Sequence, residues 1–106
     1  MANYVFVYTG GPGMMMSDEQ RKAVMDAWTN WFGQLGDQLV DSGNPFGPAA
    51  KTLTQGGQVR EGAIGEMATG YSIIKADSFD AAVDLAKSCP QLDGGAVTVY
   101  ETFAVM

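Results

Sequence analysis

Residues 3–9 read Asn-Tyr-Val-Phe-Val-Tyr-Thr, and this stretch decides the fold, because an unbroken run of aromatic and β-branched residues is typical of a β-strand. The run leads directly into Gly10-Gly11-Pro12-Gly13, a sequence that ends a strand in a loop. Successive side chains of a strand point to opposite faces, so the aromatic residues share one face and the valines share the other. Both faces of the strand are therefore apolar, and we expect the sheet to be covered on both sides.

A helix is predicted after this loop. Ser17 followed three residues later by Gln20 forms a capping box at its start. The apolar residues that follow fall within an arc of roughly 100° of a helix, which predicts one buried aromatic stripe. They are Val24, Trp28, Trp31, Phe32, Leu35 and Leu39. Gly43 and Pro45 stop the pattern, so the helix is expected to end before them.

The rest of the chain supplies three more strands and a second helix. Residues 49–54 are a weak strand candidate, residues 70–76 a clear one and residues 96–103 a final one, while Asp77-Ser78 caps a short helix. The order β-α-β-β-α-β predicts an α+β, ferredoxin-like fold, with a four-stranded antiparallel sheet and two helices on one face. Without an internal linker or repeat, residues 1–106 are expected to form a single domain, although no clear pattern assigns most of residues 44–68.

The composition excludes several classes of function. The chain of 106 residues has a net charge of −6, and its six basic residues form no patch, so we expect no nucleic-acid partner and no membrane partner. It has no histidine and one cysteine, Cys89, which excludes an ordinary zinc site and histidine-based catalytic pairs. We therefore expect no metal and no cofactor. The sequence shows neither a signal peptide nor a membrane span, so the expected location is the cytoplasm.

The composition and length of the chain also predict self-association. Charged residues make up 17% of the chain, against about 25% in an average domain, and a chain of this length has a thin core. Together with the two apolar faces of the first strand, this predicts a homodimer in which a partner covers the open face of the sheet.

The chain resembles the YCII-related family of small bacterial domains, which is related to the dimeric α/β-barrel superfamily. The resemblance lies in the opening strand, in Trp-Phe-Gly-Gln-Leu-Gly at 31–36, in the segment 69–82, and in the tail from Cys89-Pro90 to Glu101. It implies a dimeric α/β barrel in which two subunits face their sheets toward each other. Residues 60–66 depart from the Asp-Gly-Pro-Phe motif of many relatives, and a chain without histidine lacks the His-Asp dyad proposed for some of them.

Five residues are predicted to bind a ligand: Tyr8, Met16, Tyr71, Glu66 and Tyr100. The tyrosines lie in predicted strands and carry hydroxyls that can donate to a ligand, Glu66 is a nearby carboxylate, and methionine adapts to irregular apolar ligands. We expect a small apolar or aromatic molecule to bind in a cleft between the sheet and the partner subunit. The alternatives are a small acid-base enzyme (an isomerase, a lyase or a cofactor-free oxygenase) using Tyr and Glu, and a non-enzymatic interaction module with packed interface tyrosines.

Trp28, Asn30 and Trp31 invite comparison with cofactor-independent monooxygenases of the same superfamily, which use an Asn and two Trp residues. Helical spacing places Asn30 on the opposite side of the helix from both indoles. The two tryptophans are therefore predicted to pack in the core rather than to converge with Asn30 on a substrate.

Overall fold

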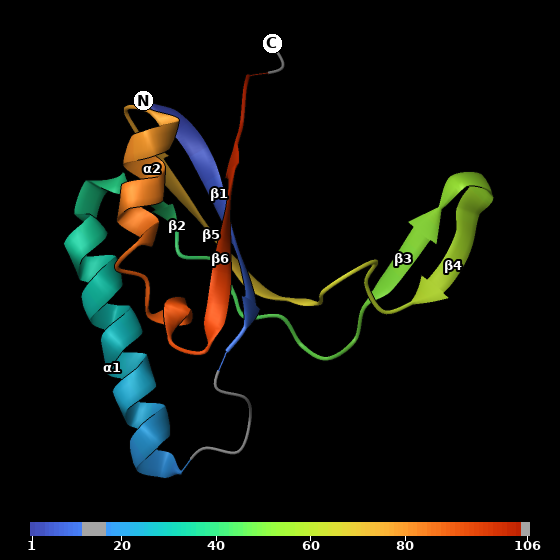
Figure 1. Ribbon diagram of the computed structural model, residues 1–106, viewed down its shortest axis with the longest axis horizontal. Coiled ribbons are helices and arrows are strands. Elements are labelled where there is room, and N and C mark those ends of the chain that lie inside the picture. Colours follow the sequence, from blue (N-terminus) through green and yellow to red (C-terminus); the bar gives the residue numbers. More distant parts are fainter. Residues whose placement is uncertain (12–16, 105–106) are drawn as a thin grey trace.

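A computed structural model describes residues 1–11 and 17–104 (Figure 1). It contains two α-helices, α1 (Asp18–Leu35) and α2 (Phe79–Ala86). The strands are β1 (Ala2–Gly10), β2 (Leu39–Asp41), β3 (Lys51–Thr54), β4 (Gln58–Glu61), β5 (Ala68–Ala76) and β6 (Gly95–Glu101). Three short 3₁₀ turns lie between them: η1 (Gly36–Gln38), η2 (Gln55–Gly57) and η3 (Pro90–Leu92).

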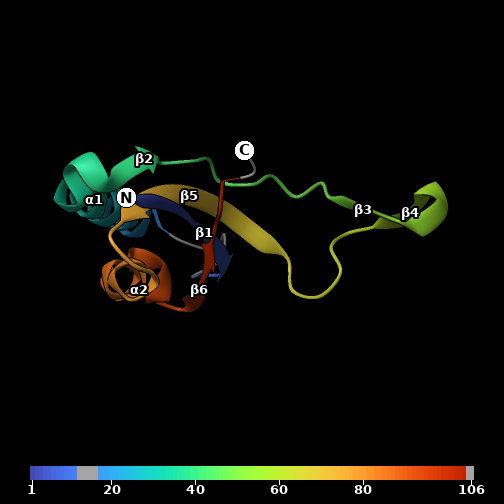
Figure 2. The same cartoon turned by 90° about the horizontal axis from the view of Figure 1, so that it is seen from above.

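Four of the strands form one antiparallel sheet in the order β2-β5-β1-β6. The strand that opens the sequence is thus central, since β1 pairs with β5 on one side and with β6 on the other. Both helices lie against one face of this sheet, as the two views in Figure 1 and Figure 2 agree. This arrangement confirms the predicted ferredoxin-like α+β fold.

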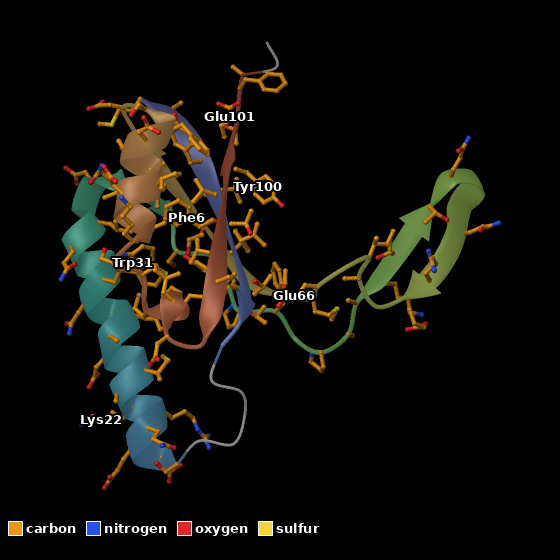
Figure 3. All side chains as sticks on the ribbon, in the orientation of Figure 1. Phe6, Lys22, Trp31, Glu66, Tyr100 and Glu101 are labelled. Carbon is orange, nitrogen blue, oxygen red and sulfur yellow. The ribbon has the colours of Figure 1, made fainter. Side chains whose placement is uncertain are left out.

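The core lies between the helices and β1. Tyr4, Phe6 and Tyr8 are buried on the helix side, as the alternation in residues 3–9 predicts. From α1, Trp31 is 2% exposed and its ring stacks on Phe6 with a centroid distance of 6.2 Å (Figure 3). The aromatic stripe of the first helix therefore packs on the sheet, as its period predicts.

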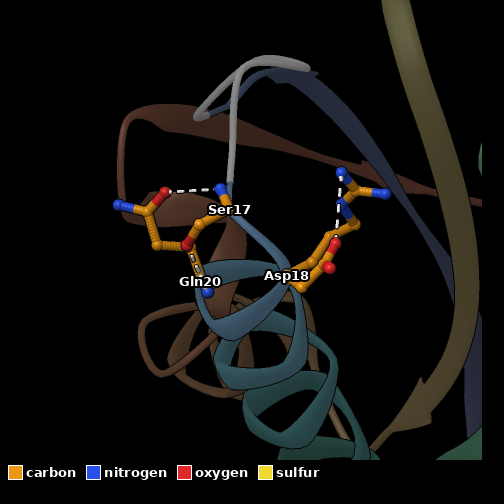
Figure 4. A network of polar contacts seen from close by, with 4 residues as sticks. Ser17, Asp18 and Gln20 are labelled. Atoms are coloured by element: carbon orange, nitrogen blue, oxygen red, sulfur yellow. Dashed lines mark hydrogen bonds and ion pairs between the residues drawn. The ribbon is translucent and has the colours of Figure 1, made fainter.

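The start of α1 follows the predicted capping box (Figure 4). The Gln20 backbone N–H donates to Ser17 Oγ at 3.1 Å, and the Ser17 backbone N–H donates to Gln20 Oε1 at 2.9 Å. Two backbone donors that have no partner inside the helix are thus satisfied by these side chains.

The end of α1 and the second strand of the sheet differ from the prediction. The helix stops at Leu35, because Gly36 adopts a left-handed φ of 55° that breaks the α-helical path. Leu39, expected on the helix, instead begins β2 and pairs with Ile74 of β5. The ladder with β5 satisfies backbone groups that two further helical turns would have paired internally.

The strand candidate at residues 49–54 is also placed differently. Its residues 51–54 form β3, which pairs with β4 in a separate two-stranded sheet rather than with β5. This β3–β4 hairpin extends away from the helices, on the side of the main sheet that they leave open (Figures 1 and 2).

Candidate functional site

Tyr8, the first of the predicted site residues, points to the helix side of the sheet and is 5% exposed. Its hydroxyl donates to Ser72 Oγ at 2.7 Å, and the Ser72 hydroxyl donates to the Ser42 carbonyl oxygen at 2.7 Å. Burial raises the pKa of Tyr8, and the hydrogen bond to Ser72 offsets this only in part. The phenol is therefore neutral at physiological pH, and its one proton is already donated within the core.

Cys89 lies beside Tyr8 and is 3% exposed. Burial raises the pKa of its thiol to about 11, against a smaller lowering by the backbone of Gln91. The nucleophilic thiolate is thus scarce near neutral pH, and Cys89 behaves as the small buried residue that its sequence context predicts.

Tyr71 and Tyr100 lie on the opposite, open face of the sheet. In the sheet register, Tyr71 is opposite Val7 and Tyr100 is opposite Val5, so the two tyrosines flank β1. Tyr71 is partly buried and stacks on Phe46 with a ring-centroid distance of 5.9 Å, whereas Tyr100 is 54% exposed. Figure 3 shows Tyr100 on the side away from Trp31 and Phe6.

The remaining two predicted residues join neither group. Glu66 is exposed in the segment that connects β4 to β5 (Figure 3), and Met16 lies outside the described residues. The structure therefore divides the predicted set: Tyr8 lies within the core, Tyr71 and Tyr100 share the open face, and Glu66 lies in the connection toward the hairpin. Tyr8 is separated from the other two tyrosines by the sheet itself.

A groove of about 420 Å³ lies between α1 and the segment 88–93 around η3. Its apolar wall is formed mainly by Trp28, which is partly exposed, and by the small residues of the helix, while amide, hydroxyl and carboxylate side chains complete the lining. The full lining is Ala23, Val24, Ala27, Trp28, Asn30, Trp31, Gln34, Ser88, Pro90, Gln91 and Asp93. Sequence reasoning did not single out this surface, because its two sides are more than fifty residues apart.

Hydrogen bonds hold the two sides of the groove in place. Trp31 Nε1 donates to Ser88 Oγ at 3.1 Å, which links α1 to the segment after α2. Gln91 Nε2 donates to the carbonyl oxygens of Thr9 and Gly10, at 2.9 and 3.0 Å, which ties η3 to the end of β1. The groove is therefore built on the sheet and does not depend on a loose loop.

Asn30 also lines the groove with both tryptophans. Helical spacing correctly places Asn30 away from the buried stripe, since it is exposed whereas Trp31 is buried. Trp31 is buried in the core, as predicted, so that Trp28 is the tryptophan that shares the accessible surface of this groove with Asn30. The wall and the exposed rim become parts of one concave surface.

The described residues contain no group of three or more His, Cys, Asp or Glu side chains that could hold a metal ion. Within the same ranges, no helix has the length and apolar character needed to cross a membrane.

The comparisons with known proteins identify the fold. No protein-family model and no curated protein matches the chain. Among solved structures, it is similar to 5-chloro-2-hydroxyhydroquinone dehydrochlorinase (TftG) from Burkholderia phenoliruptrix AC1100, in complex with 2,5-dihydroxybenzoquinone. The TM-score is 0.55 and the identity 19%, over 95% of this chain and 93% of that one. This likeness shows a shared fold across nearly the whole chain, whereas membership of the YCII-related family and of its superfamily stays a prediction.

Proposed function

We propose that the protein binds a small planar molecule, an aromatic or quinone-like ring, in the groove between α1 and η3. The observation that carries this proposal is the pairing of the partly exposed Trp28 indole with a polar rim in one groove of about 420 Å³. This volume lies within the roughly 300–1,000 Å³ that is usual for small-molecule sites. Indoles offer flat apolar area for stacking, while the rim can fix the orientation of a ring.

The rim favours a ring that carries oxygen substituents. The Asn30 and Gln34 amides can both donate and accept hydrogen bonds, and no hydrogen bond occupies either side chain within the described residues. The structurally similar dehydrochlorinase was solved with 2,5-dihydroxybenzoquinone, which has this kind of chemistry. The ligand of that similar structure supports an oxygen-substituted ring as the ligand class, and the lining of the groove supports the groove as the binding site.

We further propose that the chain acts as a homodimer whose subunits face their sheets toward each other. The open face carries Val5, Val7 and Ile73, none of which a helix covers. If this face were solvated, polar residues would alternate along each strand with the apolar residues of the helix-covered face. Tyr71 and Tyr100 would then lie in the seam, where the stacking of Phe46 on Tyr71 favours a second place for an aromatic ligand.

Binding rather than catalysis is proposed because the acid-base pairs expected of a Tyr-Glu enzyme are not formed. Among the described residues, no tyrosine hydroxyl is hydrogen-bonded to a carboxylate, and the buried hydroxyl of Tyr8 donates to Ser72. The raised pKa of Tyr8 also makes it a weak acid near neutral pH.

Titration with 2,5-dihydroxybenzoquinone, followed by tryptophan fluorescence, tests the groove. The wild-type protein should show saturable quenching, and Asn30→Ala should weaken the affinity by about three- to tenfold, as expected for one lost hydrogen bond. Asp26→Ala is the matched control, since Asp26 is exposed on the same helix but does not line the groove. Quenching that is linear and equal in all three proteins would be collisional and would contradict the proposed site.

A further inference from the structure

We infer that the β3–β4 hairpin is an arm that packs against a second copy of this chain. The inference rests on the proposed self-association through the open sheet face. It adds a second contact surface, formed by Leu53 and Val59, that neither the fold nor the likeness to the dehydrochlorinase assigns.

The hairpin exposes apolar side chains in a paired position. Leu53 and Val59 are directly opposite each other in the β3–β4 register, so both side chains lie on the same face of the ribbon. They are 66% and 58% exposed. The opposite face carries Thr52, Thr54, Gln58 and Arg60. Lys51 and Glu61 lie on the same face as Leu53 and Val59 and form an ion pair at 3.4 Å, so the exposed apolar contact is the single Leu53–Val59 pair beside that ion pair. Two exposed apolar side chains paired across a ribbon favour packing on another surface.

Within residues 1–11 and 17–104, no strand of the main sheet pairs with this ribbon. It forms a separate two-stranded sheet. An isolated two-stranded hairpin in water is marginally stable at best. Packing against a second molecule would supply the apolar burial that the hairpin lacks.

The position of the hairpin identifies a second copy as the occupant. Both ribbon views show the helices on one side of the main sheet and the hairpin far out on the other side (Figures 1 and 2). Two sheets that pack face to face lie about 10 Å apart. A second copy on the open face would therefore sit beside the arm, and by two-fold symmetry each copy would hold the other with its own arm.

The solvent-exposed surface area of the chain is also consistent with a second copy as the partner. The chain exposes 7513 Å², whereas a folded monomer of this mass exposes roughly 5,700 Å². The excess of roughly 1,800 Å² lies within the ~1,000–2,500 Å² that each subunit of an obligate homodimer buries. The radius of gyration of 15.3 Å likewise exceeds the roughly 13 Å of a compact chain of this length.

Sedimentation velocity over a dilution series tests the arm with Val59→Glu and its matched control Gln58→Glu. Both substitutions add one negative charge to adjacent exposed positions on opposite faces of the ribbon. Val59→Glu should raise the dimer Kd by roughly tenfold or more, as expected for a charge placed in a desolvated contact, and Gln58→Glu should change it by less than about threefold. In wild-type protein, hydrogen exchange at the amides of residues 52–60 should slow as the protein concentration passes the dimer Kd.

The possible outcomes separate the two proposals. A wild-type chain that stays monomeric near 11.2 kDa at all concentrations overturns both the dimer and the arm. A stable dimer in which both variants behave alike, with hairpin exchange independent of concentration, keeps the dimer and overturns the arm.

Discussion

Replacing Trp31 with Ala should be the most damaging single change in α1. The side chain is 2% exposed and lies among three other rings, with centroid distances of 6.2 Å to Phe6, 5.7 Å to Trp28 and 5.4 Å to Phe32. Truncation removes the indole from this cluster and leaves a cavity that a four-strand sheet and one helix cannot close. The expected loss of unfolding free energy is about 3–5 kcal/mol.

The lost hydrogen bond adds little to this loss. Trp31 Nε1 donates to Ser88 Oγ, but Ser88 is exposed, so water can replace the indole donor. Trp31→Phe separates the two contributions, because it keeps most of the ring contacts and deletes only the donor and part of the volume. It should restore more than half of the stability that Trp31→Ala loses.

Urea unfolding followed by far-UV circular dichroism at one fixed protein concentration measures these differences, since dimerisation would make stability concentration-dependent. For a domain of this size, a loss of 3 kcal/mol or more corresponds to a fall in Tm of at least about 12 °C. Asn30→Ala, one residue away on the exposed side, should cost less than ~0.5 kcal/mol. Equal losses for Trp31→Ala and Asn30→Ala would refute the packing of α1 described above.

Two further predictions concern the buried hydroxyl and the buried thiol. Tyr8→Phe should lower the unfolding free energy by about 0.5–1.5 kcal/mol, because Ser72 loses its buried donor, whereas Tyr71→Phe on the open face should change it by less than ~0.5 kcal/mol in the same urea assay. Equal losses would contradict the assignment of the two residues to opposite faces. Cys89 has a pKa raised to about 11 from a reference of 9.0, so the folded state holds its thiol proton more tightly than the unfolded state. Its contribution to the free energy of unfolding should therefore be fully present below pH 9.0 and be lost as the pH rises toward 11. Urea unfolding across this pH range measures the loss, and Cys89→Ala should reduce it.

Local sequence determined β1, β5 and β6, the starts of both helices, and the faces that these elements bury. Alternation in residues 3–9 correctly predicts which side chains of β1 face the helices, because side-chain direction in a strand follows from the backbone alone. The capping box at Ser17 and the aromatic stripe of α1 are likewise set by neighbours three or four residues apart. These signals predicted the ferredoxin-like fold class, although the predicted order took residues 49–54 as the strand of the sheet that residues 39–41 in fact supply.

Only the tertiary structure decided where α1 ends and which segment completes the sheet. The helical spacing of the apolar residues places Leu39 on the buried stripe of α1, but in the structure Leu39 pairs with Ile74 of β5 and belongs to β2. Residues 51–54 have strand character that is satisfied by β4, so they leave the sheet and form the arm. The partner of Leu39 lies far along the chain, so no local window contains it. The partner of β3 is local, because β4 follows directly after η2, and sequence reasoning missed the strand character of residues 58–61.

The candidate site depended on the tertiary structure even more strongly. Three tyrosines in strands look equivalent in the sequence, yet Tyr8 is bound to Ser72, 64 residues away, while Tyr71 and Tyr100 face the open side. The groove lies where the segment from Ser88 to η3 meets α1, and Ser88 is 57 residues from its partner Trp31. The sequence alone determined which residue types could bind a ring, and the packing of distant segments decided which of them meet, because a concave surface is formed by elements that only the complete fold brings together.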